Sequence, residues 1–383
     1  MKGNYYDNFI AEAEKFVSMP VDFGKIPNHE QYIDYNISKQ RLSHVLQDSL
    51  ENLDKLLISF DNNWNSDNGK KFWFTNYNDL LRNIRTLVWE KNIKTYLVDN
   101  SESYLWSEVG LDMFLKKENV KKASNNADIQ FFEVNKLIAD STHLLILGNA
   151  DTLNRINNGS INVFITGIEQ VFKNTNDLEL YLNVLKDSAK AHNKHFFPIL
   201  YTPTEKNHDN LYIMDNMRSN VLNTSPQRLA LACVHCGLCN DVCPVKGFAG
   251  ADAYDNIFSG PFANVVLPFL ESVEDYGFVS SACTLCGNCE KVCPVSIPLR
   301  YLILQNRHYL FEKNKMSFSE KNQVKNICKQ LSSRGKMNKM SLLKKLAFRR
   351  MMSKNALRKR KYPPFAKNSF NQQYLKNLKE KYK

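Results

Sequence analysis

The chain has 383 residues, of which 43% are hydrophobic and 11% aromatic. This length and composition are typical of a globular protein with two or three domains. No apolar run approaches the ~20 residues that a membrane-spanning helix requires, and residues 1–16 lack the apolar segment of a secretory signal. These features argue against a membrane-spanning protein and against a disulfide-stabilised secreted protein. We therefore expect a cytoplasmic location with reduced thiols.

The positive charge is concentrated at one end of the chain. The net charge is +12, and residues 313–383 contain 22 Lys and Arg residues against only Glu320 and Glu380. That segment therefore carries +20, and the rest of the chain carries −8. A basic arm of this kind binds an acidic protein surface, stays solvated and disordered, or binds nucleic acid or anionic lipid. We favour the protein contact, with any membrane association peripheral.

The first predicted elements are helices, and strands follow them. Apolar residues recur at spacings of three and four over residues 5–18 and 37–60, as on one face of a helix. Residues 60–69 are rich in turn-forming residues and predict a loop. Short apolar runs then alternate with helical stretches. The predicted strands are residues 70–76, 94–100, 127–132, 143–149, 162–167, 195–201 and 210–216, and the predicted helices between them include residues 78–92, 106–117 and 176–192.

This alternation predicts a parallel sheet with helices on its faces. Residues 260–277, beyond the last strand, are predicted to be largely helical. In the basic arm, residues 340–357 form an amphipathic pattern that ends before Pro363. We therefore divide the chain into four parts, which are an N-terminal helical segment (1–34), an α/β domain (35–220), a mainly helical cysteine-rich domain (221–312) and the basic arm (313–383).

Eight of the nine cysteines occur in two copies of one spacing. The first copy is Cys233, Cys236, Cys239 and Cys243 followed by Pro244, and the second is Cys283, Cys286, Cys289 and Cys293 followed by Pro294. Four thiolates at this spacing, followed by proline, suit a [4Fe–4S] cluster. Because each iron of the cluster takes one soft thiolate, two copies predict two clusters and hence an electron carrier.

The two copies are expected to share their ligands. In two-cluster proteins of this spacing, the fourth cysteine of each run ligates the other cluster. We therefore expect cluster 1 on Cys233, Cys236, Cys239 and Cys293, and cluster 2 on Cys283, Cys286, Cys289 and Cys243. Gly237 and Gly287 occupy the same place in the two runs, where the absence of a side chain permits the positive φ of a tight loop. The two prolines then redirect the chain.

Other interpretations of the cysteines are less consistent with the spacing. Structural zinc sites use paired cysteines separated by a longer spacer, and disulfides require an oxidising compartment. Cys328 stands alone in a basic, helical stretch and is expected to be a buried or partly exposed structural thiol. His235 lies between two ligands, and since all four cysteines are present we expect it beside the cluster, or without a role, rather than as a ligand.

Several segments resemble a known family. The runs LYIMDNMRSN (211–220), FSGPFANVVLPFL (258–270), SSACTLCGNCEKVCPVSIPL (280–299) and KYPPFAKNSF (361–370), with the first cysteine motif, resemble the B-type iron–sulfur protein of bacterial lactate-utilisation systems. The region before the clusters is similar to the LUD domain of that family, which has a Rossmann-like fold of the isomerase and CoA-transferase type. The similarity covers roughly residues 40–375.

The α/β region departs from the family pattern. The family's lysine- and serine-rich loop corresponds to residues 98–110, and its glycine-rich stretch corresponds to residues 126–147, which contain no glycine; Asp140, Ser141 and Thr142 replace an acidic triplet there. Glycines at strand ends allow a ligand or a phosphate to approach the backbone. Asp99, Glu102 and Glu169 are candidate polar site residues here, or else helix caps and surface groups.

The resemblance implies an electron-transfer subunit of a complex that oxidises L-lactate to pyruvate. Its partners would be a cysteine-rich oxidoreductase subunit and a LUD-only subunit. The chain has no nucleotide-binding glycine motif and no hydrolase triad, so we assign no catalytic residue to it. The alternatives are a ferredoxin-like carrier for a different dehydrogenase or quinone-linked complex, an iron–sulfur sensor that binds nucleic acid through its basic arm, and a structural subunit whose clusters only stabilise the fold.

Overall fold

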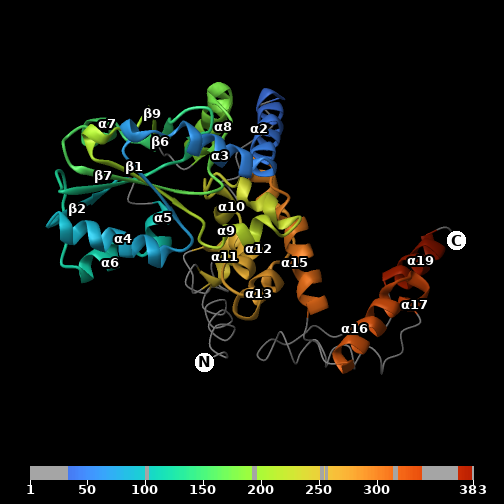
Figure 1. Ribbon diagram of the computed structural model, residues 1–383. Helices are drawn as coiled ribbons and strands as arrows, with labels where there is room; N and C mark the ends of the chain where they lie inside the picture. Colours follow the sequence, from blue (N-terminus) through green and yellow to red (C-terminus); the bar gives the residue numbers. More distant parts are fainter. Residues whose placement is uncertain are drawn as a thin grey trace. The chain divides into compact units, whose positions relative to one another are not determined.

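A computed structural model describes residues 33–99, 103–191, 196–250, 254, 258–313, 318–338 and 370–381. The chain divides into two compact units, Met1–Leu310 and Phe311–Lys383 (Figure 1). The helices predicted over residues 5–18 and 340–357 lie outside the described residues. No helix among the described residues is both long and apolar enough to cross a membrane.

A six-stranded sheet lies at the centre of the first unit. Its strand order is β1-β10-β7-β4-β2-β3, and every neighbouring pair is parallel. The strands are β1 (Lys70–Phe74), β2 (Thr95–Val98), β3 (Lys121–Lys122), β4 (Ile129–Glu133), β7 (Ile161–Gly167) and β10 (Asp209–Met214). The predicted parallel-sheet α/β architecture is therefore confirmed.

Four further strands form a second, mixed sheet in the order β8-β5-β6-β9. They are β5 (Lys136–Ile138), β6 (Leu144–Gly148), β8 (Val171–Phe172) and β9 (Phe197–Tyr201). The prediction that residues 143–149 and 195–201 join the parallel sheet was wrong, because β6 pairs antiparallel with both β5 and β9. A turn in which the Ser141 N–H donates to the Ile138 carbonyl at 3.2 Å reverses the chain between β5 and β6.

The parallel sheet is buried on both faces. Alternate residues of a strand point to opposite faces, so Phe131 packs with helices on one side and Phe132 packs with the second sheet on the other. The helices of the first side are α4 (Tyr77–Glu90), α5 (Tyr104–Val109) and α6 (Leu111–Lys117). The predicted helix over residues 106–117 is thus split, at Gly110, which has a φ of +69°.

Two helices precede the first strand, and two others lie between the later strands. They are α2 (Ile33–Glu51), α3 (Leu53–Asn63), α7 (Thr152–Ile156) and α8 (Leu178–Ala191), with short 3-10 turns at Ser66–Asn68, Thr175–Asp177 and Glu205–Asn207. The helical pattern predicted over residues 37–60 is confirmed, although helix α3 extends into the predicted loop. The core around α3 includes Leu53, Leu56 and Phe60.

The rest of the first unit is helical. Its helices are α9 (Arg218–Leu222), the 3-10 helix η6 (Gln227–Ala232), α10 (Leu238–Asp241), α11 (Pro244–Ala249), α12 (Gly260–Leu270), α13 (Val273–Ala282), α14 (Asn288–Val292) and α15 (Leu299–Lys313). The second unit contains α16 (Phe318–Leu331), α17 (Arg334–Asn338) and α19 (Phe370–Lys381).

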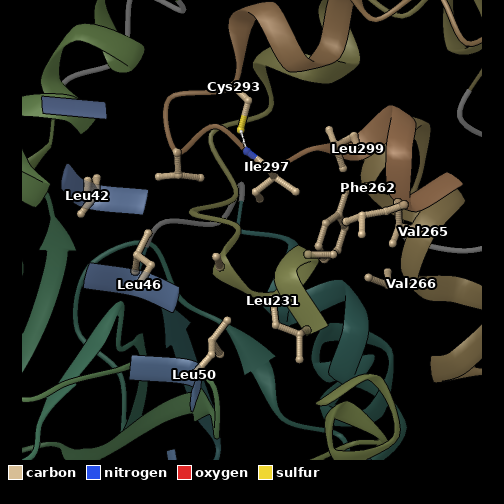
Figure 2. Packing of buried hydrophobic residues seen from close by; sticks show 14 of the residues in the cluster. Leu42, Leu46, Leu50, Leu231, Phe262, Val265, Val266, Cys293, Ile297 and Leu299 are labelled. Atoms are coloured by element: carbon tan, nitrogen blue, oxygen red, sulfur yellow. Dashed lines mark hydrogen bonds between the residues drawn. The ribbon is translucent and has the colours of Figure 1, made fainter. Parts of the chain in front are cut away.

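One apolar core joins the helical region to the α/β region. Leu42, Leu46 and Leu50 form a row along α2, and they belong to the same buried cluster as Cys293 and Ile297 (Figure 2). Burial of such side chains is the main favourable term in folding. The cysteine-rich segment is therefore packed against the α/β region within one unit.

Candidate metal centre

The two cysteine motifs fold alike. Gly237 and Gly287 have φ values of +82° and +79°, and they begin the short helices α10 and α14. The positive φ predicted at both glycines is therefore confirmed. Cys243 caps helix α11, and Pro244 occupies its first turn, where a missing N–H costs nothing.

Backbone N–H groups point at the sulfur atoms. His235 N donates to Cys233 Sγ at 3.4 Å, and Leu285 N donates to Cys283 Sγ at 3.3 Å. His235 and Leu285 occupy the same place in the two motifs, and both have positive φ, at 51° and 57°. These donors favour a charged sulfur over a neutral thiol. The loops are thus shaped to hold thiolates.

The fourth cysteines receive similar donors. Lys246 N donates to Cys243 Sγ at 3.5 Å, and Ile297 N donates to Cys293 Sγ at 3.4 Å (Figure 2). Both of these cysteines are buried. Backbone N–H groups therefore donate to the first and the fourth cysteine of each motif. The two motifs thus share this pattern of donors as well as the cysteine spacing.

The fourth cysteine of the second motif lies near enough to the thiols of the first motif to interact with them electrostatically. Burial raises the pKa of Cys239 well above its ordinary value, and repulsion from Cys233, Cys236 and Cys293 raises it further. Burial likewise raises the pKa of Cys236 to about 12, with Cys293 again among the neighbouring charges. We call Cys233, Cys236, Cys239 and Cys293 the first thiol group.

The reciprocal arrangement holds for the other four cysteines. Burial raises the pKa of Cys289 to about 12, and repulsion from Cys243 and Cys283 adds to the effect. Burial also raises the pKa of Cys243, whose neighbouring sulfur charges are those of Cys283 and Cys286. We call Cys243, Cys283, Cys286 and Cys289 the second thiol group.

The donor set fits iron–sulfur clusters. Thiolates gathered at one site that is partly shielded from solvent would repel one another and would be costly to desolvate, so they require cations to which they bind directly. Each thiol group offers four soft ligands, one for each iron of a cubane. The backbone N–H donors satisfy sulfur lone pairs from the protein side. The chemistry of each group therefore suits a [4Fe–4S] cluster.

A small polar cavity lies beside the first thiol group. It measures about 30 Å³ and is enclosed by the carboxyl ends of β4 and β7 on one side and by the loop of Val234 and His235 on the other. Glu133 and Tyr104 also line it. Burial raises the pKa of Glu133 to about 6, although a hydrogen bond from Ser103 opposes the shift. The cavity is large enough for water molecules only.

His235 is a neutral packing group in this cavity. Its ring lies against that of Tyr104, with the ring centroids 4.0 Å apart and the planes tilted by 30°. Burial lowers the pKa of His235 to about 3, and the charge of Arg218 lowers it further. The histidine therefore lies beside the first thiol group, in keeping with the expected position outside the ligand set.

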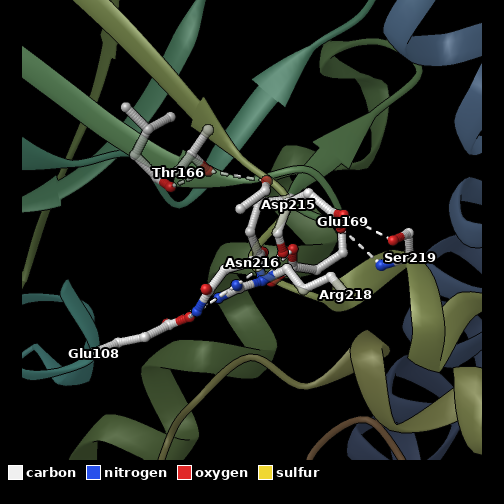
Figure 3. Close-up of polar contacts among 10 residues, drawn as sticks. Glu108, Thr166, Glu169, Asp215, Asn216, Arg218 and Ser219 are labelled. Atoms are coloured by element: carbon white, nitrogen blue, oxygen red, sulfur yellow. Dashed lines mark hydrogen bonds and ion pairs between the residues drawn. The ribbon is translucent and has the colours of Figure 1, made fainter. Parts of the chain in front are cut away.

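A buried ion network (Figure 3) lies against Gly167, which also lines the cavity. Arg218 Nη1 and Nη2 donate to the two carboxylate oxygens of Glu108 at 2.8 and 2.9 Å, and Arg218 Nε lies 2.9 Å from Glu169 Oε2. Asn216 Nδ2 donates to Glu108 Oε1 at 2.7 Å. The Arg218 side chain is only 4% exposed. Burial alone would lower the pKa of Arg218, but Glu108 and Glu169 outweigh it and keep the guanidinium charged.

The candidate polar residues of the α/β region do not form one site. Glu169 belongs to the Arg218 network, whereas Asp99 is buried against Thr152 and Arg155. Burial raises the pKa of Asp99, and Arg155 opposes that shift. Glu102 lies outside the described residues. Sequence reasoning missed Glu108 and Arg218, because no spacing in the sequence links residues 110 positions apart.

Cys328 takes no part in the two thiol groups. It lies on α16 in the second unit and is exposed. The expectation of a buried or partly exposed thiol was therefore wrong, because α16 leaves most of its described side chains open to solvent.

Comparison with protein families identifies the class of protein. The family model described as a 4Fe-4S dicluster domain matches residues 227–297, which contain both cysteine motifs. The match and the eight clustered cysteines indicate two [4Fe–4S] clusters. The chain is therefore an iron–sulfur protein with an α/β region built on a parallel sheet.

The curated relatives share one name. The chain is 30% identical over 228 residues to Lactate utilization protein B of Oceanobacillus iheyensis, a match that covers 57% of this chain and 47% of that protein. It is 31% identical over 206 residues to Lactate utilization protein B of Geobacillus sp. strain WCH70, with 51% and 43% covered. The resemblance to this type of protein is thus confirmed over about half of the chain, and the matches span less than half the length of these relatives.

Among solved structures, the chain is similar to a DUF162 family protein from Deinococcus radiodurans. The sequence identity is 10% and the TM-score 0.29, and the match covers 43% of this chain and 98% of that chain.

Proposed function

We propose that this chain is the electron-transfer subunit of a complex that oxidises L-lactate to pyruvate. Cluster 1 would be held by Cys233, Cys236, Cys239 and Cys293, and cluster 2 by Cys243, Cys283, Cys286 and Cys289. When bound, each cluster exchanges one electron at a time. Oxidation of a hydroxy acid to a keto acid releases two electrons, so two neighbouring clusters suit the task.

The observation that supports this proposal is the nearness of each fourth cysteine to the thiols of the other motif. Cys293 lies among the thiols of the first motif, and Cys243 lies among those of the second. The charge of Cys289, which belongs to the other group, also acts on Cys239. Two groups that interpenetrate in this way keep their centres close, which favours electron transfer between them.

The substrate chemistry is assigned to a partner. A site for a hydroxy acid needs a free cation to bind the carboxylate, and Arg218 is already bound by Glu108 and Glu169. The adjoining cavity of about 30 Å³ is lined by a further carboxyl group, that of Glu133. Both features disfavour an anionic substrate there. The partners we propose are a cysteine-rich oxidoreductase subunit and a LUD-only subunit.

We assign the α/β region, residues 35–220, to a divergent LUD domain of Rossmann-like type. Its parallel sheet and the helices on one face support this assignment. Residues 221–312 would then be the two-cluster domain, residues 1–34 an N-terminal helical segment and residues 313–383 a basic arm that contacts protein. The second, mixed sheet is a further part of the α/β domain that the alternation in sequence did not predict.

Anaerobic purification of the tagged chain from its native organism tests the function. We expect partner subunits to be recovered with it, and we expect L-lactate to bleach the iron–sulfur absorbance in the complex but not in the chain alone. Lactate oxidation by the isolated chain would overturn the division of labour. Bleaching by a different donor, with none by lactate, would show a carrier for another dehydrogenase.

A further inference from the structure

Helix α2 carries a buried lysine on the face that packs against the cysteine-rich segment. Lys39 precedes Leu42 by three positions and Leu46 by seven, so the three lie on one helix face. Lys39 is only 7% exposed, and Leu42 and Leu46 are almost fully buried. Lys39 lies one turn beyond Leu42, away from Leu46.

The surroundings of Lys39 include thiols from both motifs. Burial lowers the pKa of Lys39, and the charges of Cys293 and Cys236 oppose that shift. Both cysteines belong to the first thiol group. Helix α2 also packs against the 3-10 helix η6, which leads directly into Cys233. A lysine ammonium is therefore placed against this group by a helix that contains no cysteine.

We propose that Lys39 raises the reduction potential of cluster 1. The proposal rests on the ligand sets given under the proposed function. Reduction transfers one electron from a donor to the cluster, and the donor is oxidised by the same one electron. The added negative charge is stabilised by a nearby ammonium in a medium of low dielectric constant. Lys39 thus stabilises the reduced cluster through its charge and is not a ligand.

The second thiol group has a different cationic neighbour. Arg307 Nε donates to the Ser280 carbonyl at 2.9 Å, and Arg307 Nη2 donates to the carbonyls of Ser281 and Cys283. Its charge lowers the pKa of Cys283, against the larger effect of burial. Because this arginine belongs to the other group, a change at Lys39 is expected to affect one cluster only.

Two other charges beside the first group have opposite signs. Lys136 and Glu169 both interact with the Cys233 thiol, and they carry opposite charges. The charge of Glu169 also acts on Lys136 itself. Because the charges of Lys136 and Glu169 oppose each other, this pair does not replace the positive charge that the first thiol group loses when Lys39 is replaced.

The test is a redox titration of the anaerobically purified full chain with dithionite, followed by electron paramagnetic resonance. In Lys39→Met and Lys39→Gln, the reduction equilibrium of one cluster should become about tenfold less favourable, which for one electron is about 59 mV more negative. The other cluster should keep its potential, and Lys39→Arg should restore the first. Lys55→Met, which removes an exposed lysine from α3, is the matched control and should shift neither.

The outcomes separate the two proposals. Unchanged potentials in both neutral variants, at full iron content, would overturn the role of Lys39 and leave the ligand sets intact. Equal shifts in the reduction potentials of both clusters would overturn the selective role of Lys39. They would indicate that its two neighbours, Cys236 and Cys293, bind different clusters. A wild-type chain without two reducible clusters would instead contradict the proposed function.

Discussion

The two thiol groups share one motif but differ in their surroundings. The first thiol group lies against α2 and the α/β region, beside the contacting rings of His235 and Tyr104. The second thiol group includes Cys286, which is exposed. The loops themselves are nearly the same, with matched positive φ values and matched N–H donors. The motif therefore sets the ligand geometry, and the elements packed around it set access to solvent.

This difference predicts an order of iron loss. A chelator or oxygen reaches an exposed ligand first, so the second thiol group should release its iron before the first. We expect two phases, each of about four irons from a total of about eight. Iron release to a coloured chelator, followed together with electron paramagnetic resonance, measures this. A single phase, or early loss from the first group, would contradict the comparison.

Disrupting the Arg218 ion network should reverse the order in which the two thiol groups lose iron. Arg218→Met leaves the buried carboxylates of Glu108 and Glu169 without their partner, which costs about 3–5 kcal/mol. Urea unfolding of the anaerobic protein should show that loss, and iron should then leave the first group earlier. Arg82→Met is the control, because the exposed Arg82–Asp79 pair contributes about 0–1 kcal/mol. Equal effects of the two changes would refute the role of the network.

The cavity predicts a smaller, pH-dependent effect. The pKa of Glu133 is raised from 4.5 to about 6 in the folded protein, so the folded state holds this proton more tightly than the unfolded state. Stability from this group is therefore present below pH 4.5 and falls as the pH rises through 6. Glu133→Gln should remove that fall and gain up to about 2 kcal/mol at pH 7 relative to wild type.

Urea unfolding of both proteins between pH 4 and pH 7 measures the difference. Both curves should run in parallel below pH 4.5, which serves as the internal control. Curves that stay parallel over the whole range would show that Glu133 ionises as freely in the folded state as in the unfolded state.

Local features of the fold could be predicted from the sequence. Short apolar runs located strands β1, β2, β4, β7 and β10 of the parallel sheet but not β3, helical stretches located α2 to α6, α8 and α12, and the cysteine spacing located both loops. The positive φ of Gly237 and Gly287 followed from the absence of a side chain. Each of these features depends on residues a few positions apart.

Features that depend on distant residues could not be predicted. Strands β5 and β8 have three and two residues, too few for alternation to be visible. The antiparallel pairing of β6 depends on a turn that carries no glycine or proline. The pairing of Glu108 with Arg218, and the approach of Lys39 to Cys293, join residues separated by a whole domain. Only the folded chain brings these groups together.

The most direct test of the central claim counts iron in two double variants of the anaerobic chain. If the fourth cysteines are exchanged between motifs, Cys233→Ser with Cys293→Ser disables one cluster and should leave about four irons. Cys233→Ser with Cys243→Ser would then disable both clusters and should leave almost none. The opposite result, with iron kept in the second double variant and lost in the first, would show that each motif holds its own cluster and would contradict the account.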